Sequence, residues 1–222
     1  MKRLLGAGMR EAGYVTRRVR ASLSGSGVWS RRSFANYQEY VDLQLAKTLD
    51  EERRRKWLSS EWEPKVDAFQ RLFGDLAEQG LLPSRGPALC IGARTGQEVQ
   101  ALRNLGLEAI GVDLAPSPPL VVEGDLHALP FPDGEFTFVF SNVMDHALFP
   151  RKAVEEIERV AAGGATVVLH LTVGRGTDSF GVTEIAHASD VVELFEWSTS
   201  LMSKALSPPF LSMNHEIVMT RS

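Results

Sequence analysis

The chain has 222 residues, of which 44% are hydrophobic and 23% charged, and its formal net charge is −4. This length suits one α/β domain with additional segments, and the composition is that of an ordinary globular protein. The single cysteine, Cys90, excludes an internal disulfide framework and a cysteine-rich zinc site. The longest apolar runs are far shorter than the roughly 18 residues that span a bilayer, so no transmembrane helix is expected.

The charge is unevenly distributed along the chain. Residues 1–35 contain eight Lys or Arg residues and one acid, so this segment carries +7 and the rest of the chain −11. A basic, acid-poor N-terminus with Ser and Gly is typical of a transit peptide, which would direct the protein to a plastid or mitochondrion. The alternative is a basic arm, disordered or in contact with anionic lipid or nucleic acid, on a cytoplasmic protein. The acidic body disfavours nucleic acid as a partner, because phosphate binding requires a basic face on the domain itself.

Residues 36–85 predict a helical cap ahead of the main domain. Apolar residues recur at helical spacing from Tyr37 to Leu49, and again from Val66 to Leu76 before Gly80 ends the pattern. The intervening "DEERRRK" is expected to be a solvated helix end or a turn. Aromatic residues in this segment would form a substrate lid or simply pack the helices together: Tyr37, Tyr40, Trp57 and Trp62.

Short apolar runs alternate with helical patterns from residue 86 to residue 222. Strands are expected at 88–91, 108–114, 119–125, 136–140 and 165–173, and helices at 96–106, 151–164 and 188–197, the last capped by Ser189 or Asp190. Two weaker strands, 199–205 and 215–220, have no helix between them. This order predicts an α/β, Rossmann-like, doubly wound sheet of seven mostly parallel strands with an antiparallel hairpin at its C-terminal edge.

Glycines and polar residues follow the first four expected strands, where open α/β sheets bind their ligands. Gly92 and Gly96 of "GARTG" allow the backbone to approach a ligand closely. Asp113, about twenty residues after this loop, suits the two hydroxyls of a ribose. Asp125 is placed to accept a hydrogen bond from an adenine amino group, and Asn142 to contact the far end of the ligand. The pattern favours an adenosine ligand, although the two glycines and the two aspartates also have a simpler interpretation as turn or cap residues.

Residues 86–173, and more weakly the tail to the C-terminus, resemble the class I S-adenosylmethionine-dependent methyltransferases of the "methyltransferase type 11" group. The resemblance rests on "LCIGARTG", "EGDLHALPFPDGEFTFVFS" and "EEIERVAAGGATVVL". It implies S-adenosylmethionine as cofactor. The methyl acceptor is expected to be a small molecule, with a macromolecular or organellar target as the less favoured alternative. The GARTG loop is similar to that of plant proteins, which indicates a plant or algal source. The cofactor-binding residues that the resemblance implies are Gly92, Ala93, Arg94, Gly96, Asp113, Leu114, Asp125, Leu126 and Asn142.

Two positions depart from the family pattern. Cys90 stands where the family usually has an acid that anchors the methionine end of the cofactor, and Arg94 stands where it usually has glycine. Arg94 would contact the cofactor carboxylate through a bidentate pair, point into solvent, or block the site. These departures leave a second interpretation open, a methyltransferase-like binding or assembly protein without catalytic activity. A nucleotide-binding oxidoreductase is a third, weaker interpretation, since "GARTGQ" lacks the G-x-G-x-x-G pattern.

The segment "SNVMDHALFP" holds the catalytic candidates Asp145 and His146. Methyl transfer needs a general base only where the acceptor must lose a proton, and His146 would suit an oxygen or nitrogen acceptor. The alternative is that both residues pack locally. His170, inside an apolar strand, is expected to be a satisfied core histidine, and the spacing of the remaining histidines predicts no metal site. The acceptor is expected to depend on the N-terminal helices and on the loop 174–188. The sequence does not indicate an oligomeric state.

Overall fold

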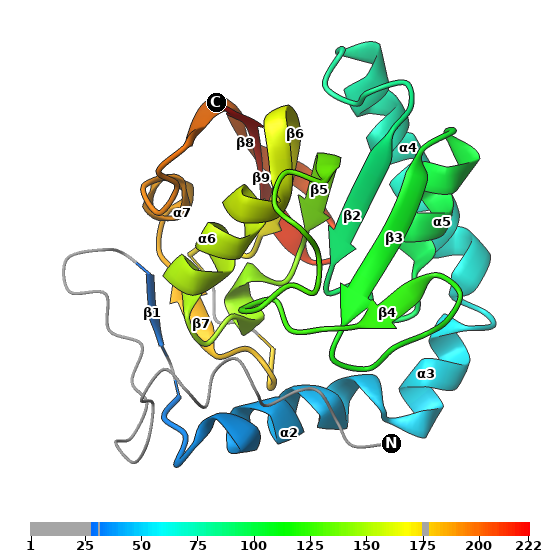
Figure 1. Ribbon diagram of the computed structural model, residues 1–222. Coiled ribbons are helices and arrows are strands. Elements are labelled where there is room, and N and C mark those ends of the chain that lie inside the picture. Colours follow the sequence, from blue (N-terminus) through cyan, green and yellow to red (C-terminus); the bar gives the residue numbers. More distant parts are fainter. Residues whose placement is uncertain (1–27, 31, 175–177) are drawn as a thin grey trace.

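The computed structural model describes residues 28–30, 32–174 and 178–222. Seven strands form the main sheet in the order β4-β3-β2-β5-β6-β9-β8 (Figure 1). Strands β2 to β6 pair in parallel, whereas β9 pairs antiparallel with both β6 and β8. The predicted Rossmann-like sheet with its C-terminal edge hairpin is therefore confirmed. The strands are β2 (Pro87–Ile91), β3 (Glu108–Asp113), β4 (Val121–Glu123), β5 (Phe136–Ser141), β6 (Ala161–Leu171), β8 (Ser198–Phe210) and β9 (Met213–Arg221).

An apolar core lies on each face of this sheet. Helices α4 (Trp62–Glu78) and α5 (Gln97–Asn104) cover one face, where Phe73 packs against Phe138 and Phe140. Helices α6 (Pro150–Val160) and α7 (Ala188–Val192) belong to the core on the other face. Because both faces are buried, the central strands read as continuous apolar runs rather than as alternating patterns.

Helix α2 (Tyr37–Thr48) runs across the carboxyl ends of the strands (Figure 1). Its buried Tyr40 and Val41 pack with Phe34, Leu148 and Val182 in a third, smaller core. The helix is thus held against the edge of the sheet at which α/β folds bind their ligands.

The segment "DEERRRK" is a helix rather than a turn or a helix end. Helix α3 (Glu51–Trp57) begins at Asp50, whose carboxylate accepts a hydrogen bond from the Arg53 amide, and its acids precede its bases as the helix dipole favours. Helix α4 begins at Trp62, one turn before the apolar pattern that predicted it. The segment 36–85 therefore holds α2, α3 and α4, of which α4 also covers the sheet.

A second, two-stranded sheet joins segments that the sequence analysis placed in an arm and in a loop. Strand β1 (Val28–Ser30) pairs antiparallel with β7 (Thr183–Ile185). The loop expected over 174–188 therefore contains a strand. Most of the predicted transit peptide, residues 1–27 and 31, lies outside the described residues, so that interpretation stays a prediction.

Two predicted helix boundaries were wrong. Helix α6 ends at Val160 and β6 begins at Ala161, whose extended backbone pairs with Phe136, so the Gly163–Gly164 pair lies inside a strand. Helix α7 ends at Val192, and its N-cap is His187 rather than Ser189 or Asp190. Asp190 instead accepts a hydrogen bond from the His187 amide as part of a capping box. Within the described residues, no helix has the length and apolar character needed to cross a membrane.

Candidate active site

Two adjoining cavities lie at the carboxyl ends of the strands. The smaller has a volume of about 60 Å³ and the larger about 530 Å³. Both are lined by Lys47, Gly92, Arg94 and His146, so these four residues separate the two spaces. The larger cavity falls within the range of about 300–1,000 Å³ that small-molecule sites occupy, whereas the smaller would hold only one or two water molecules.

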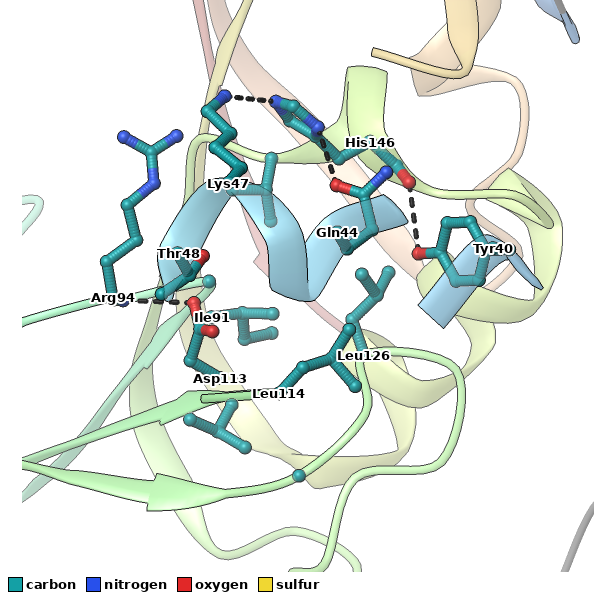
Figure 2. Close-up of a pocket in the computed structure, with 14 residues that line it drawn as sticks. Tyr40, Gln44, Lys47, Thr48, Ile91, Arg94, Asp113, Leu114, Leu126 and His146 are labelled. Atoms are coloured by element: carbon teal, nitrogen blue, oxygen red, sulfur yellow. Dashed lines mark hydrogen bonds between the residues drawn. The ribbon is translucent and has the colours of Figure 1, made fainter. Parts of the chain in front are cut away.

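Helix α2 forms one wall of the smaller cavity (Figure 2). Tyr40, Gln44 and Lys47 follow one another at spacings of four and three residues, which places them on one face of the helix. The opposite wall comes from the ends of β2 and β3 and from the segment after β4, with Asp113, Leu114 and Leu126. The cavity is small because α2 lies directly over these residues.

Asp113 ends strand β3 with its carboxylate at the smaller cavity. Its two oxygens each accept one backbone hydrogen bond of 3.0 Å, from the Arg94 amide and from the Ala115 amide. Burial raises the pKa of Asp113, and these hydrogen bonds and the nearby Arg94 charge oppose the rise. A carboxylate oxygen has room for a second donor, so Asp113 can accept two further hydroxyl groups.

The loop after β2 turns through backbone conformations that favour glycine. Gly92 has φ 77°, and a Cβ there would lie 2.5 Å from the Val143 side chain. Arg94 has φ 47°, which explains why a glycine is usual at this position in the family that the loop resembles. Its guanidinium lies 5.5 Å from the centre of the Trp57 ring. The Arg94 side chain points away from Leu114 and Leu126 (Figure 2). Arg94 therefore lines the larger cavity and leaves the apolar walls of the smaller one clear.

Seven of the nine predicted cofactor residues line one or both cavities. Gly96 does not: it is the N-cap of α5 with φ 93°, and a Cβ there would lie 2.8 Å from Leu120 Cβ, so its role is packing. Asp125 does not either. The seven are Gly92, Ala93, Arg94, Asp113, Leu114, Leu126 and Asn142.

Asp125 is occupied by hydrogen bonds within the protein. The Tyr37 hydroxyl donates to its Oδ2, while the His127 amide and His127 Nδ1 both lie 2.9 Å from its Oδ1. The Phe149 amide donates to His127 Nε2, so the ring proton is on Nδ1 and points to Asp125. Burial favours a higher pKa for Asp125, but the His127 and Tyr37 contacts outweigh it and lower that pKa. An adenine amino group would have to compete with Tyr37 for this carboxylate.

The catalytic candidates lie on a single turn of 3₁₀ helix, η1 (Met144–His146). His146 Nε2 is 3.2 Å from Lys47 Nζ, and Nδ1 is 3.0 Å from Gln44 Oε1 (Figure 2). Burial, followed by the charges of Lys47 and Arg94, lowers the pKa of His146 to about 3. Burial raises the pKa of Asp145, which lines the larger cavity, to about 6. Asp145 is therefore the better proton acceptor of the two.

Two other expectations concern buried residues. Cys90, which lies in the apolar run 88–91, is fully buried. His170 is also buried, and its Nε2 lies 2.9 Å from Glu216, but its Nδ1 has no hydrogen-bond partner among the described residues, so only one of its two ring nitrogens is satisfied there. Among the described residues, no group of three His, Cys, Asp or Glu side chains is placed to hold a metal ion.

The sequence analysis missed several residues that line the cavities. Those on α2 had a detectable signal, because Gln44 and Lys47 share the helical face of Tyr40. The others come from separate elements and have no local sequence pattern that links them. The missed residues are Gln44, Lys47, Thr48, Lys65, Glu98, Asp178 and the hairpin tip 211–213.

Comparisons with known proteins agree with this geometry. Residues 89–169 match a family model described as "Methyltransferase domain". A malonyl-[acyl-carrier protein] O-methyltransferase from Halorhodospira halophila is 34% identical over 135 residues, which cover 52% of this chain and 46% of that protein. The chain thus matches about half the length of this curated relative.

Solved structures share the fold at low identity. The PH0226 protein from Pyrococcus horikoshii superposes with a TM-score of 0.58 at 16% identity, over 74% of this chain and 92% of that one. The [4+2]-cyclase SpnF superposes with a TM-score of 0.56 at 17% identity, over 69% and 80% of the two chains. Residues 89–169 thus match a methyltransferase domain, in agreement with the class I S-adenosylmethionine-dependent type that the sequence predicts, while the plant or algal source stays a prediction.

Proposed function

We propose that this protein is an S-adenosylmethionine-dependent methyltransferase that acts on a small-molecule acceptor. The observation that carries the proposal is the juxtaposition of Asp113 with the loop 92–96 at two adjoining cavities. Asp113 has the capacity to accept both ribose hydroxyls, and Leu114 and Leu126 offer apolar walls for an adenine. Bound there, S-adenosylmethionine would supply an activated methyl group next to the larger cavity.

The larger cavity supports a small acceptor. Its volume of about 530 Å³ suits a compact molecule, and its far wall comes from Thr172, Asp178 and the hairpin tip 211–213. In such a space, orientation and exclusion of water provide most of the catalytic effect that a protein contributes to methyl transfer. Asp145 would take the proton from an acceptor that must lose one, while burial and the charge of Lys47 keep His146 neutral, as a hydrogen-bond acceptor for Lys47.

Calorimetric titration with S-adenosylmethionine and S-adenosylhomocysteine tests this proposal. We expect binding to the unmodified protein and a loss of at least tenfold in affinity for Asp113→Asn, which keeps the shape of the side chain but removes acceptor strength. Glu123→Gln is the matched control for Asp113→Asn, because it also changes an acid to its amide, but at an exposed position. Absence of heat with both ligands would overturn the proposal.

A second candidate function is a methyltransferase-like protein with another activity or a binding role. Tyr37 holds Asp125, and the smaller cavity has a volume of only about 60 Å³, so α2 would have to move away before an adenosine could bind, and the second function would leave α2 in place. The superposition with a [4+2]-cyclase illustrates that this fold also serves other chemistry. The same titration separates the two functions if the second one does not use the cofactor, because a protein that cannot bind S-adenosylmethionine gives no heat with either ligand.

We also propose that residues 1–35 act as an organelle transit peptide. The support is their charge of +7 and their near absence of acids. Fusion of residues 1–35 to a fluorescent reporter is expected to place the reporter in plastids or mitochondria. A uniform cytosolic signal would contradict the proposal.

A further inference from the structure

Glu98 is a buried acid at the larger cavity that makes no hydrogen bond to another residue among those the structure describes. It lies in the first turn of α5, its exposed fraction is 5%, and it lines the cavity together with Arg94. Its carboxylate accepts a hydrogen bond from its own backbone amide, and no other described residue donates to it. Burial raises the pKa of Glu98 to about 7, against the opposing charges of Arg94 and Lys65. A carboxylate in this position needs a donor that the protein itself does not supply.

Strand β2 offers no charged group to this space. Cys90 is fully buried in the core between the sheet and α4 and α5, and it lines neither cavity. The nearby negative charge of Glu98 contributes to raising the pKa of the Cys90 thiol, which indicates that Glu98 lies close to the end of the strand. Helix α5 therefore brings an acid to the place where the strand has none.

Arg94 provides the opposite charge. Its positive φ directs the side chain toward the larger cavity, where the guanidinium lies over the Trp57 ring. Trp57 is itself fixed, because Gln97 Nε2 donates a 2.8 Å hydrogen bond to its carbonyl. Among the described residues, no carboxylate lies within 4 Å of the Arg94 guanidinium, whereas Lys47 is paired with Asp178. Other charged side chains also line this cavity, but Lys47 pairs with Asp178 and Lys65 with Glu61. Glu98 and Arg94 are thus an acid and a base that form no ion pair with each other or with another described residue.

We propose that Glu98 and Arg94 together bind the amino-acid end of the ligand, Glu98 accepting from its ammonium and Arg94 donating to its carboxylate. This inference rests on the proposed function and assigns to α5 the acid that β2 lacks. A zwitterionic α-amino acid fits both charges, whereas an anionic group alone would meet repulsion from Glu98 and a cationic group alone would meet repulsion from Arg94.

The simpler explanation of Glu98 is that an acid in the first turn stabilises the helix dipole of α5. In that role, replacing Glu98 would change the stability of the protein but not the affinity that the amino-acid end of a ligand contributes. Glu63 occupies the first turn of α4 at an exposed position, so Glu63→Gln is a matched control for the dipole effect.

Calorimetry with three probes separates these explanations. S-Adenosylhomocysteine has both charges, decarboxylated S-adenosylmethionine lacks the carboxylate, and 5′-methylthioadenosine lacks the whole amino-acid end. We expect Glu98→Gln to lower the affinity for the first two probes by roughly 10- to 100-fold and to leave the affinity for the third unchanged. Arg94→Gln is expected to lower the affinity for S-adenosylhomocysteine alone. For the unmodified protein, affinity for S-adenosylhomocysteine should fall as the pH drops below about 7. Glu98→Gln should remove the part of this dependence near pH 7 and leave any part near pH 6, where Asp145, another acid of this cavity, takes up its proton.

The outcomes distinguish failure of this inference from failure of the proposed function. If Glu98→Gln lowers the affinity for all three probes equally, or lowers none of them, the proposed role of Glu98 is wrong, although the protein still binds the cofactor. If the unmodified protein binds none of the probes, the proposed function and this inference both fail. Thermal unfolding of Glu98→Gln beside Glu63→Gln measures any dipole effect separately.

Discussion

Tyr37→Phe is expected to weaken the fold and to strengthen cofactor binding at the same time. The substitution removes only the hydroxyl that donates to Asp125 and keeps the ring, which stacks on Phe149 and contacts Tyr40. Because Tyr37 lies on α2, its hydrogen bond holds this helix over the smaller cavity. If adenine takes the place of the hydroxyl at Asp125, this bond must break before the cofactor binds.

The size of both effects follows from the same bond. A hydrogen bond to a charged acceptor contributes about 1.5–3 kcal/mol to the free energy of unfolding. Tyr37→Phe should lower that free energy by this amount, which shifts the midpoint of thermal unfolding by about 2–4 °C per kcal/mol for a chain of this size. The same free energy no longer opposes opening of α2, so the dissociation constant for the cofactor should fall by roughly tenfold or more.

Thermal unfolding and calorimetric titration with S-adenosylhomocysteine check the two signs. Tyr40→Phe is the matched comparison, because the Tyr40 hydroxyl also holds α2, through a 3.0 Å hydrogen bond to the His146 carbonyl, but donates no hydrogen bond to Asp125. It should loosen α2 without freeing Asp125, so Tyr37→Phe should tighten binding more than Tyr40→Phe does. If Tyr37→Phe binds the ligand no more tightly than the unmodified protein, Tyr37 does not compete for Asp125 and the reasoning fails.

Three further predictions concern stability. Gly96→Ala should lower the free energy of unfolding by about 2 kcal/mol or more, since φ is 93° and the added Cβ would lie 2.8 Å from a neighbouring side chain. Gly74→Ala, in an open helical position, should raise this free energy by about 0.5–1 kcal/mol. Urea denaturation compares the two variants, and equal effects would contradict the argument. Because folding lowers the pKa of Asp125, its contribution is present above the unfolded value of about 3.9 and disappears as the pH falls through the folded value; acid titration should give Asp125→Asn a shallower loss of stability below about pH 5 than the unmodified protein. Glu156→Gln should cost about 1.5–3 kcal/mol in thermal unfolding, because the buried carboxylate accepts a 2.7 Å backbone hydrogen bond and an arginine pair, while the exposed Glu155→Gln should change little.

The strands of the main sheet and most helices were predictable because their signals are local. A strand that is buried on both faces can be recognised in the sequence as a short apolar run. In α6 the buried residues recur at helical spacing. The loop 92–96 and Asp113 were also predictable, since the carboxyl ends of adjacent parallel strands must meet at one edge of the sheet. The predicted end of α6 at Gly164 was wrong because pairing of Ala161 with Phe136 extends the strand, and such pairing depends on a residue 25 positions away.

The site itself needed the tertiary structure. The sequence by itself determined the fold class, the glycine loop and the carboxylate that follows β3, because each depends on residues near one another in the chain. It did not determine that Tyr37 holds Asp125 from 88 positions away, that α2 lies over the smaller cavity, or that Glu98 lines the larger cavity beside Arg94. These are contacts between separate elements, and their energies depend on burial and distance, which no local pattern contains.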